Sequence, residues 1–156
     1  MWSLTLKRLQ PVVVVHHLRF SRLVLLVCLG LGPFVWAEPN PHVALLHAHT
    51  PEELSGILDQ AETWSNARSE YPDQPIAIVL HGKEANVFIK RNYQMYRKLV
   101  DKAARLDAFN VVDIKICETW MGMNQVRRDQ LPAFVDTVPF GPGEEKRLLK
   151  AGYQRF

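Results

Sequence analysis

The feature that most restricts the fold is an unbroken apolar run, Ile76 to Leu80, which is followed directly by His81-Gly82. A strand with one face in water alternates apolar and polar residues, whereas this run contains no polar position. It therefore predicts a strand that is covered on both faces. Strands of that kind are typical of parallel sheets packed between layers of helices.

Other apolar runs alternate with helical patterns along the rest of the chain. We expect strands at 43–47, 111–116 and 135–138, with a short edge strand at 153–156, and helices at 51–66, 87–106 and 141–151; residues 119–131 read as one short helix or two turns. Alternating strands and helices imply right-handed crossovers. The pattern therefore predicts an α/β protein with a mostly parallel sheet and helices on both faces.

The start of the helix at 51–66 carries the clearest local signals. Thr50 is a good N-cap, Pro51 fits the first helical position, and Glu53 fits the third. Apolar residues then follow at helical spacing and form one stripe: Leu54, Ile57, Leu58, Ala61 and Trp64. At the other end of the chain, Gly152 is expected to cap the last helix.

The first 37 residues have the composition of a secretion signal. They contain Lys7, Arg8, Arg19 and Arg22 but no acidic residue, and an apolar stretch of 15 residues runs from Leu23 to Ala37. A bilayer-spanning helix needs about 20 residues. We therefore expect export to the periplasm with cleavage after Ala37, a short linker at 38–42 and a single domain at 43–156. An uncleaved membrane anchor is the alternative.

Removal of the signal changes both charge and cysteine content. The count of Lys and Arg falls from 19 to 15 against 16 acidic residues, so the net charge changes from +3 to −1. The mature chain therefore has no basic excess for binding nucleic acid, and no stable membrane insertion is expected. Cys28 leaves with the signal, so Cys117 has no partner for an internal disulfide.

Three of the predicted strands end in residues with useful chemistry. His47 and His49 follow the first strand, His81 the second, and Cys117 with Glu118 the third. In an open parallel sheet, ligands bind beyond the carboxyl ends of the strands. We expect Cys117 and His81 to act together there, with a histidine holding the thiol as a thiolate. His47, His49, Gly82 and Glu118 are the expected ligand-binding residues, and no cofactor is expected.

Simpler roles exist for the same residues. Cys117 closes an apolar strand and is of a residue type that is often buried. His81 would equally serve to bind a loop carbonyl. His47, His49 and Cys117 together give a third possibility, a metal site, although their spacing is not specific to one.

Three segments, considered together, resemble exported members of the DsrE/DsrF-like family. They are IAIVLHG (Ile76 to Gly82), NVVDIKICETWMGM (Asn110 to Met123) and LPAFVDTVPFGPGEEKRLLKAGYQRF (Leu131 to Phe156). The resemblance implies a three-layer α/β/α fold, a parallel sheet of about five strands, and homo-oligomers, often trimers or hexamers. The best understood relatives pass sulfur as a cysteine persulfide, on a cysteine that belongs to a different local motif.

The leading hypothesis is therefore a small periplasmic homo-oligomer. In it, Cys117, assisted by His81, binds or relays sulfur or another thiol-reactive species, received from a sulfur donor or a redox partner. Two alternatives remain at this point. One is a non-catalytic binding or assembly module with Cys117 buried, and the other is a metal-binding protein that uses His47, His49 and Cys117.

Overall fold

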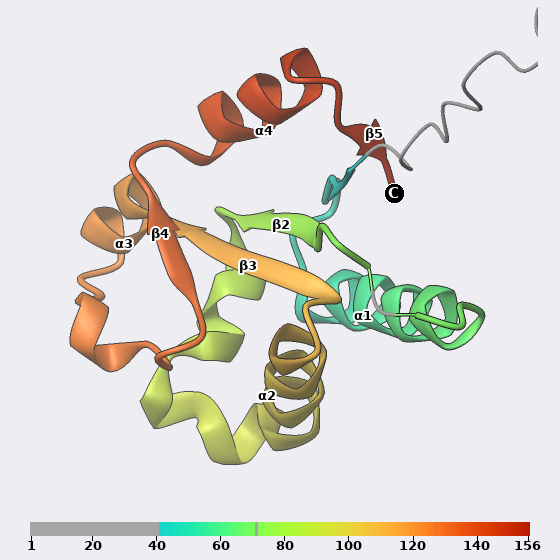
Figure 1. Ribbon diagram of the computed structural model, residues 1–156. Helices are drawn as coiled ribbons and strands as arrows, with labels where there is room; N and C mark the ends of the chain where they lie inside the picture. Colours follow the sequence, from blue (N-terminus) through green and yellow to red (C-terminus); the bar gives the residue numbers. More distant parts are fainter. Residues whose placement is uncertain (1–40, 71) are drawn as a thin grey trace, which may run out of the picture. The chain divides into compact units, whose positions relative to one another are not determined.

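The computed structural model of this chain describes residues 41–70 and 72–156, in which five parallel strands form one sheet (Figure 1). The strand order is β4-β3-β2-β1-β5. The strands are β1 (His42–Ala44), β2 (Ile76–Leu80), β3 (Val112–Cys117), β4 (Asp136–Val138) and β5 (Gln154–Arg155). The predicted signal peptide, residues 1–37, lies outside the described residues. Within 41–70 and 72–156, none of the helices has the length and hydropathy that a bilayer-spanning helix needs.

Helices cover both faces of this sheet. From β1 to β4 each strand is added beside the previous one, and the helices between them, α1 (Pro51–Asn66), α2 (Tyr93–Ala108) and α3 (Glu118–Met123), pack on one face. The chain then returns from β4 to the far side of β1, and α4 (Gly141–Lys150) crosses the opposite face (Figure 1). The predicted three-layer α/β/α fold with a parallel sheet is confirmed.

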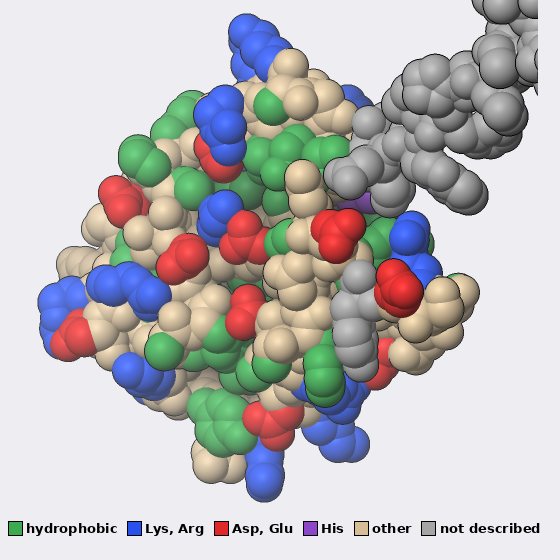
Figure 2. Space-filling model, in the orientation of Figure 1, with side chains coloured by type: hydrophobic (Ala, Val, Ile, Leu, Met, Phe, Trp, Pro, Cys, Tyr) green, Lys and Arg blue, Asp and Glu red, His purple; other side chains and the backbone are tan. Residues whose placement is uncertain are grey.

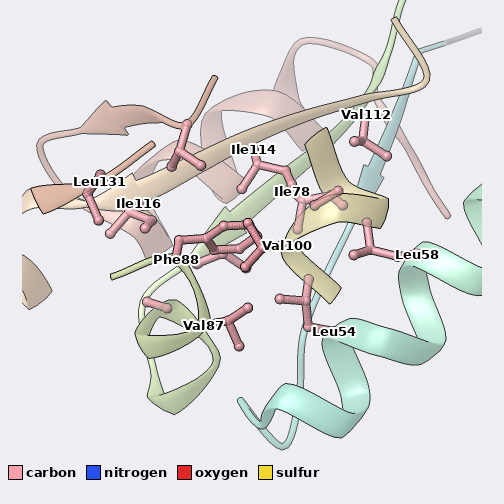
Figure 3. Packing of buried hydrophobic residues seen from close by; sticks show 14 of the residues in the cluster. Leu54, Leu58, Ile78, Val87, Phe88, Val100, Val112, Ile114, Ile116 and Leu131 are labelled. Carbon is pink, nitrogen blue, oxygen red and sulfur yellow. The ribbon is translucent and has the colours of Figure 1, made fainter. Parts of the chain in front are cut away.

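The two faces of the sheet bury cores of unequal size. Along β2, Ile76, Ile78 and Leu80 point to the larger core, while Ala77 and Val79 point to the smaller one beneath α4. Figure 3 shows the larger core, where side chains from α1 meet those from the sheet and from the segment around Phe88. All five residues of β2 are buried, as its apolar run predicts.

Local signals in the sequence place the helix ends well. The Thr50 hydroxyl accepts a hydrogen bond from the Glu53 N–H at 3.2 Å, and α1 spans the predicted residues. At the end of α4, Gly152 has a φ of +95°. The N–H groups of Gly152 and Tyr153 bond back to the carbonyls of Leu149 and Leu148, which is the Schellman arrangement.

The largest differences from the predicted elements are at the second helix and the first strand. The helix expected at 87–106 begins at Tyr93 instead, because two short 3₁₀ helices, η1 (Lys83–Phe88) and η2 (Lys90–Asn92), precede it with Ile89 extended between them. The first strand ends at Ala44 and not at 47. The segment expected to be one short helix or two turns forms α3 and a further 3₁₀ turn, η3 (Arg128–Gln130).

Candidate functional site

The connections after β3 and β4 leave the sheet toward opposite faces. The chain enters α3 from Cys117, on the face with the larger core, whereas the chain from Val138 enters α4 at Gly141 on the other face. Neighbouring parallel strands whose connections diverge in this way create the crevice where α/β proteins bind ligands. Cys117 therefore stands at this switch point of the sheet.

Strand register brings His81 beside Cys117. Leu80 pairs with Ile116 across β2 and β3, so the next residues of the two strands are also neighbours. Side chains alternate along a strand, and the residues two positions earlier, Val79 and Lys115, do not face the larger core. The imidazole therefore leaves the sheet on the side of α4. Cys117 belongs to the larger core cluster, but its thiol also contacts the first residue of α4.

Both side chains contact Gly141, the first residue of α4. The Gly141 N–H donates to the Cys117 Sγ at 3.2 Å. A Cβ on Gly141 would lie 2.9 Å from Cδ2 of His81 and 3.0 Å from its Cβ, so only glycine leaves room for the ring there. An N–H at the start of a helix stabilises negative charge, and here it points at sulfur.

Two histidines and two glutamates complete the site. The rings of His49 and His81 have centroids 4.3 Å apart. His81 Nε2 lies 3.5 Å from Oε1 of Glu145, and His49 Nδ1 lies 3.4 Å from Oε1 of Glu84. We call Cys117, His81, His49, Glu84 and Glu145 the rim cluster.

Glu84 is the most deeply buried member of the rim cluster. Its side chain has no exposed surface, and its Oε1 accepts hydrogen bonds from the N–H groups of His81 at 2.9 Å and Gly82 at 2.8 Å. Its second oxygen has no hydrogen-bond partner. An isolated buried carboxylate is costly, so the turn at Gly82 and the neighbouring imidazole of His49 are what make this position tenable.

The other two predicted ligand-binding side chains lie elsewhere. The side chain of His47 is 80% exposed, with its Nδ1 3.8 Å from Oε1 of Glu53. Glu118 is exposed and accepts a hydrogen bond from the Thr137 hydroxyl at 2.8 Å. The structure thus brings Cys117, His81 and His49 to one place, and leaves His47 and Glu118 outside the rim cluster.

Glu53 explains why the two histidines of the first loop separate. Its carboxylate accepts hydrogen bonds from three consecutive N–H groups, those of residues 47–49, at 2.7 to 2.9 Å. Burial alone would raise the pKa of Glu53, but these hydrogen bonds outweigh it and hold the pKa below its ordinary value. We call these three hydrogen bonds the Glu53 clasp. The chain bends there, with His49 at a φ of +52°, and His49 turns inward.

The geometry gives no support to a metal site at His47, His49 and Cys117. Among the residues that the structure describes, no group of three or more His, Cys, Asp or Glu side chains is placed to hold a metal ion. His47 cannot join His49 and Cys117 as a ligand in this arrangement, because its side chain is exposed and lies beside Glu53.

Sequence reasoning missed Glu84 and Glu145. Glu145 lies on the same helical face as Gly141 and Leu148, the buried residues of α4, so helical spacing would have identified it as a polar residue on an inward stripe. Glu84 follows His81-Gly82 in what reads as a polar loop. Its signal is weaker, because only the tertiary fold shows that the strand end needs an acceptor there.

Comparisons with known proteins extend to the fold. No protein-family model and no curated protein matches this chain. Among solved structures, MTH1491, a protein of unknown function from Methanobacterium thermoautotrophicum, superposes with a TM-score of 0.55 at 16% sequence identity, over 74% of this chain and 93% of that one. At this identity the likeness establishes a shared fold and nothing about activity.

Proposed function

We propose that this chain is a thiol-dependent carrier in which Cys117 accepts and passes on sulfur, with His81 assisting. The observation that carries the proposal is that Sγ and the His81 ring both lie against Gly141. Its N–H donates to Sγ, and a Cβ at this position would clash with the ring. Cysteines that do chemistry sit beside histidines and helix N-termini, because only the thiolate is a good nucleophile. The resemblance to exported DsrE/DsrF-like proteins, which implies sulfur chemistry, supports the same choice.

Each group has a definite part in this proposal. The Gly141 N–H and the start of α4 stabilise negative charge on the sulfur. His81 takes up the thiol proton, and Glu145, 3.5 Å from Nε2, stabilises the resulting imidazolium. Glu84 fixes the turn from which His81 projects. The same anion-stabilising groups would serve a persulfide on Cys117.

The rate at which the native thiol reacts tests this function. In the full chain carrying Cys28→Ser, so that Cys117 is the one thiol, we expect iodoacetamide to alkylate the native protein. His81→Gln should slow alkylation by about tenfold or more, because the assisting base is lost. His47→Gln is the matched control, since that side chain is 80% exposed and outside the rim cluster. Equal rates for the two variants would remove His81 from the mechanism.

The second candidate, a non-catalytic assembly module, is favoured by one observation. Cys117 is only 2% exposed and belongs to the larger core cluster. In that case alkylation requires denaturation, and His81→Gln changes nothing in the native protein. Such a module would associate through exposed apolar side chains, of which Met95 is 77%, Met123 79% and Phe140 56% exposed.

Export and self-association are parts of the same proposal. Expression with a functional secretion pathway should yield a periplasmic protein whose mass corresponds to cleavage after Ala37. A chain that retains residues 1–37 would favour the membrane-anchor alternative. Sedimentation at micromolar concentration should show an oligomer, a trimer or hexamer in the proposed form, and a strict monomer would contradict it.

One face of the molecule carries mixed charges. Basic and acidic side chains are interspersed over the surface seen in Figure 2, with apolar side chains between them. A nucleic-acid-binding face would instead gather Lys and Arg in a stripe or patch.

A further inference from the structure

We infer that the chain has a second binding site, separate from the rim cluster, for a small apolar molecule that carries one negative charge. The site is a cavity of about 240 Å³ whose walls come from η1, η2, α2 and the segment before β4. None of its described lining residues belongs to the rim cluster, so the inference does not rest on the proposed function. It rests on the lining of the cavity, the hydrogen bonds that shape its walls, and the charges at its mouth.

The cavity has a buried apolar floor and a more polar mouth. Four buried residues form the floor: Val87, Phe88, Ile89 and Val100. Three less buried residues complete the lining toward solvent, the exposed Lys90 and the half-buried Tyr93 and Pro132. Figure 3 labels Val87, Phe88 and Val100 within the larger core. Apolar cavities hold water poorly and take up apolar molecules, and about 150 Å³ is enough for benzene. This cavity therefore has room for a bicyclic aromatic body.

Hydrogen bonds from side chains to the backbone shape the walls of the cavity. The amide of Asn86 donates to the Lys83 carbonyl at 3.0 Å, and the amide of Asn92 donates to the Asn86 carbonyl at 2.9 Å, so η1 and η2 are tied together. Lys90 Nζ donates to the carbonyl of Asp129 at 2.8 Å and links the mouth to the segment before Pro132. The cavity is thus formed before a ligand arrives, which lowers the cost of binding.

The carboxylates linked to the mouth are each paired with an arginine. Asp101 accepts a hydrogen bond from the Tyr93 hydroxyl at 2.8 Å, and Arg128 donates to the carbonyl of Pro132 at 3.1 Å. The ion pairs around these contacts are Asp101 with Arg97 at 3.6 Å, Asp129 with Arg127 at 2.9 Å and Asp136 with Arg128 at 3.9 Å. The charges of these three pairs cancel.

Lys90 therefore supplies the charge that a ligand meets at the mouth. Its ammonium group contacts a carbonyl oxygen, that of Asp129, which takes one of its three donors and none of its charge. The other two donors and the positive charge suit a carboxylate, while the floor of the cavity suits an apolar body. A small aromatic or branched aliphatic carboxylate satisfies both.

Calorimetric titration of the full chain with two probes of the same shape tests the inference. 2-Naphthoate has a bicyclic body and a carboxylate, and 2-naphthamide has the same body without the charge. We expect saturable binding of naphthoate with a dissociation constant of about 1 mM or below. Naphthamide should bind about three- to fivefold more weakly, because it gains nothing from the charge of Lys90.

Three variants locate the probes. Lys90→Gln should weaken naphthoate binding by about three- to fivefold and leave naphthamide binding unchanged. Lys98→Gln is the matched control, because it removes the same charge from an exposed position of α2 outside the cavity lining. Val100→Phe places a ring in the cavity and should weaken the binding of both probes by about tenfold or more.

Each contrary outcome overturns a stated part of the inference. Absence of saturable naphthoate binding to the wild-type chain removes the site. Equal affinities for the two probes, or equal effects of Lys90→Gln and Lys98→Gln, overturn the choice of an anion. Unchanged binding by Val100→Phe, shown to be folded by circular dichroism, places the probes elsewhere; if that variant does not fold, the two lysine variants still decide. Naphthoate binding that appears only after an oligomer dissociates would show that a second copy fills the cavity, which also overturns the inference.

Discussion

The turn at Gly82, between His81 and Glu84 of the rim cluster, leaves no room for a side chain. A Cβ placed there would lie 2.4 Å from the Cβ of His49, 2.9 Å from its Cγ and 2.7 Å from Oε2 of Glu84. Contacts below 3.0 Å require movement of one partner. Neither partner moves easily, since His49 Cβ is attached to a backbone at φ +52° and Glu84 is fully buried. Gly82→Ala should therefore destabilise the fold.

The size of the effect follows from its parts. Forcing an extra methyl group into a packed site costs about 1–3 kcal/mol. Moving the turn also weakens the hydrogen bonds that Glu84 accepts from His81 and Gly82, which adds roughly 1 kcal/mol. Gly82 has a φ of −131°, so alanine adopts the backbone without strain and recovers about 0.4–1 kcal/mol through the unfolded state. The expected net loss is about 1–3.5 kcal/mol.

Urea denaturation of two matched variants provides the measurement. Gly56→Ala makes the same chemical change within α1, where a Cβ would meet nothing within 4 Å. It should stabilise the protein by about 0.5–1 kcal/mol through helix propensity. If Gly82→Ala proves as stable as Gly56→Ala, the close packing of His49 and Glu84 around this turn is refuted.

Three further changes test other parts of the structure. Glu53→Gln should cost about 1–2 kcal/mol at pH 7 in urea titrations, by weakening the clasp on residues 47–49. Because the folded-state pKa of Glu53 is lowered, the carboxylate stabilises the fold above its unfolded pKa. The difference in unfolding free energy between wild type and Glu53→Gln should therefore shrink as pH falls through the folded pKa. A difference that stays constant with pH would exclude the clasp. Gly152→Ala places a Cβ at φ +95° and should cost about 1–2 kcal/mol, so an unchanged urea midpoint would contradict the cap. Trp64→Ala removes an aromatic contact with Phe156 and should cost about 2 kcal/mol in thermal denaturation. Arg68→Ala, which removes the guanidinium stacked on the same indole, should cost less than about 1 kcal/mol.

Much of the fold could be predicted because its signals are local. Thr50 and Glu53 fix the start of α1 through a cap that needs only neighbouring residues, and the apolar run of β2 reflects burial on both faces. The start of α2 could not be predicted in the same way. Side chains of Asn86 and Asn92 bond to backbone carbonyls of Lys83 and Asn86, which favours 3₁₀ turns that spacing alone does not distinguish from an α-helix.

The candidate site was predictable in its position and less so in its members. Strand ends placed Cys117 and His81 at one edge, because adjacent parallel strands run in register. His47 and His49 were both expected to bind a ligand, because they follow the first strand of the predicted sheet. The carboxylate of Glu53, the third residue of α1, accepts hydrogen bonds from the N–H groups of residues 47–49, and His49 turns inward while His47 stays exposed. This effect depends on a side chain reaching back across the loop, which neither periodicity nor strand propensity reveals.

The strand order has a consequence for the order in which the sheet folds. β1 to β4 can pair one after another, each with the strand that precedes it in the sequence. The outer edge of β1 has to wait for β5, whose backbone bonds run from Gln154 to Pro41 and from Phe156 to Val43. Open strand edges are templates for aggregation. A partly folded chain in which residues 154–156 have not yet paired therefore exposes an open edge at its first strand, where other chains could pair.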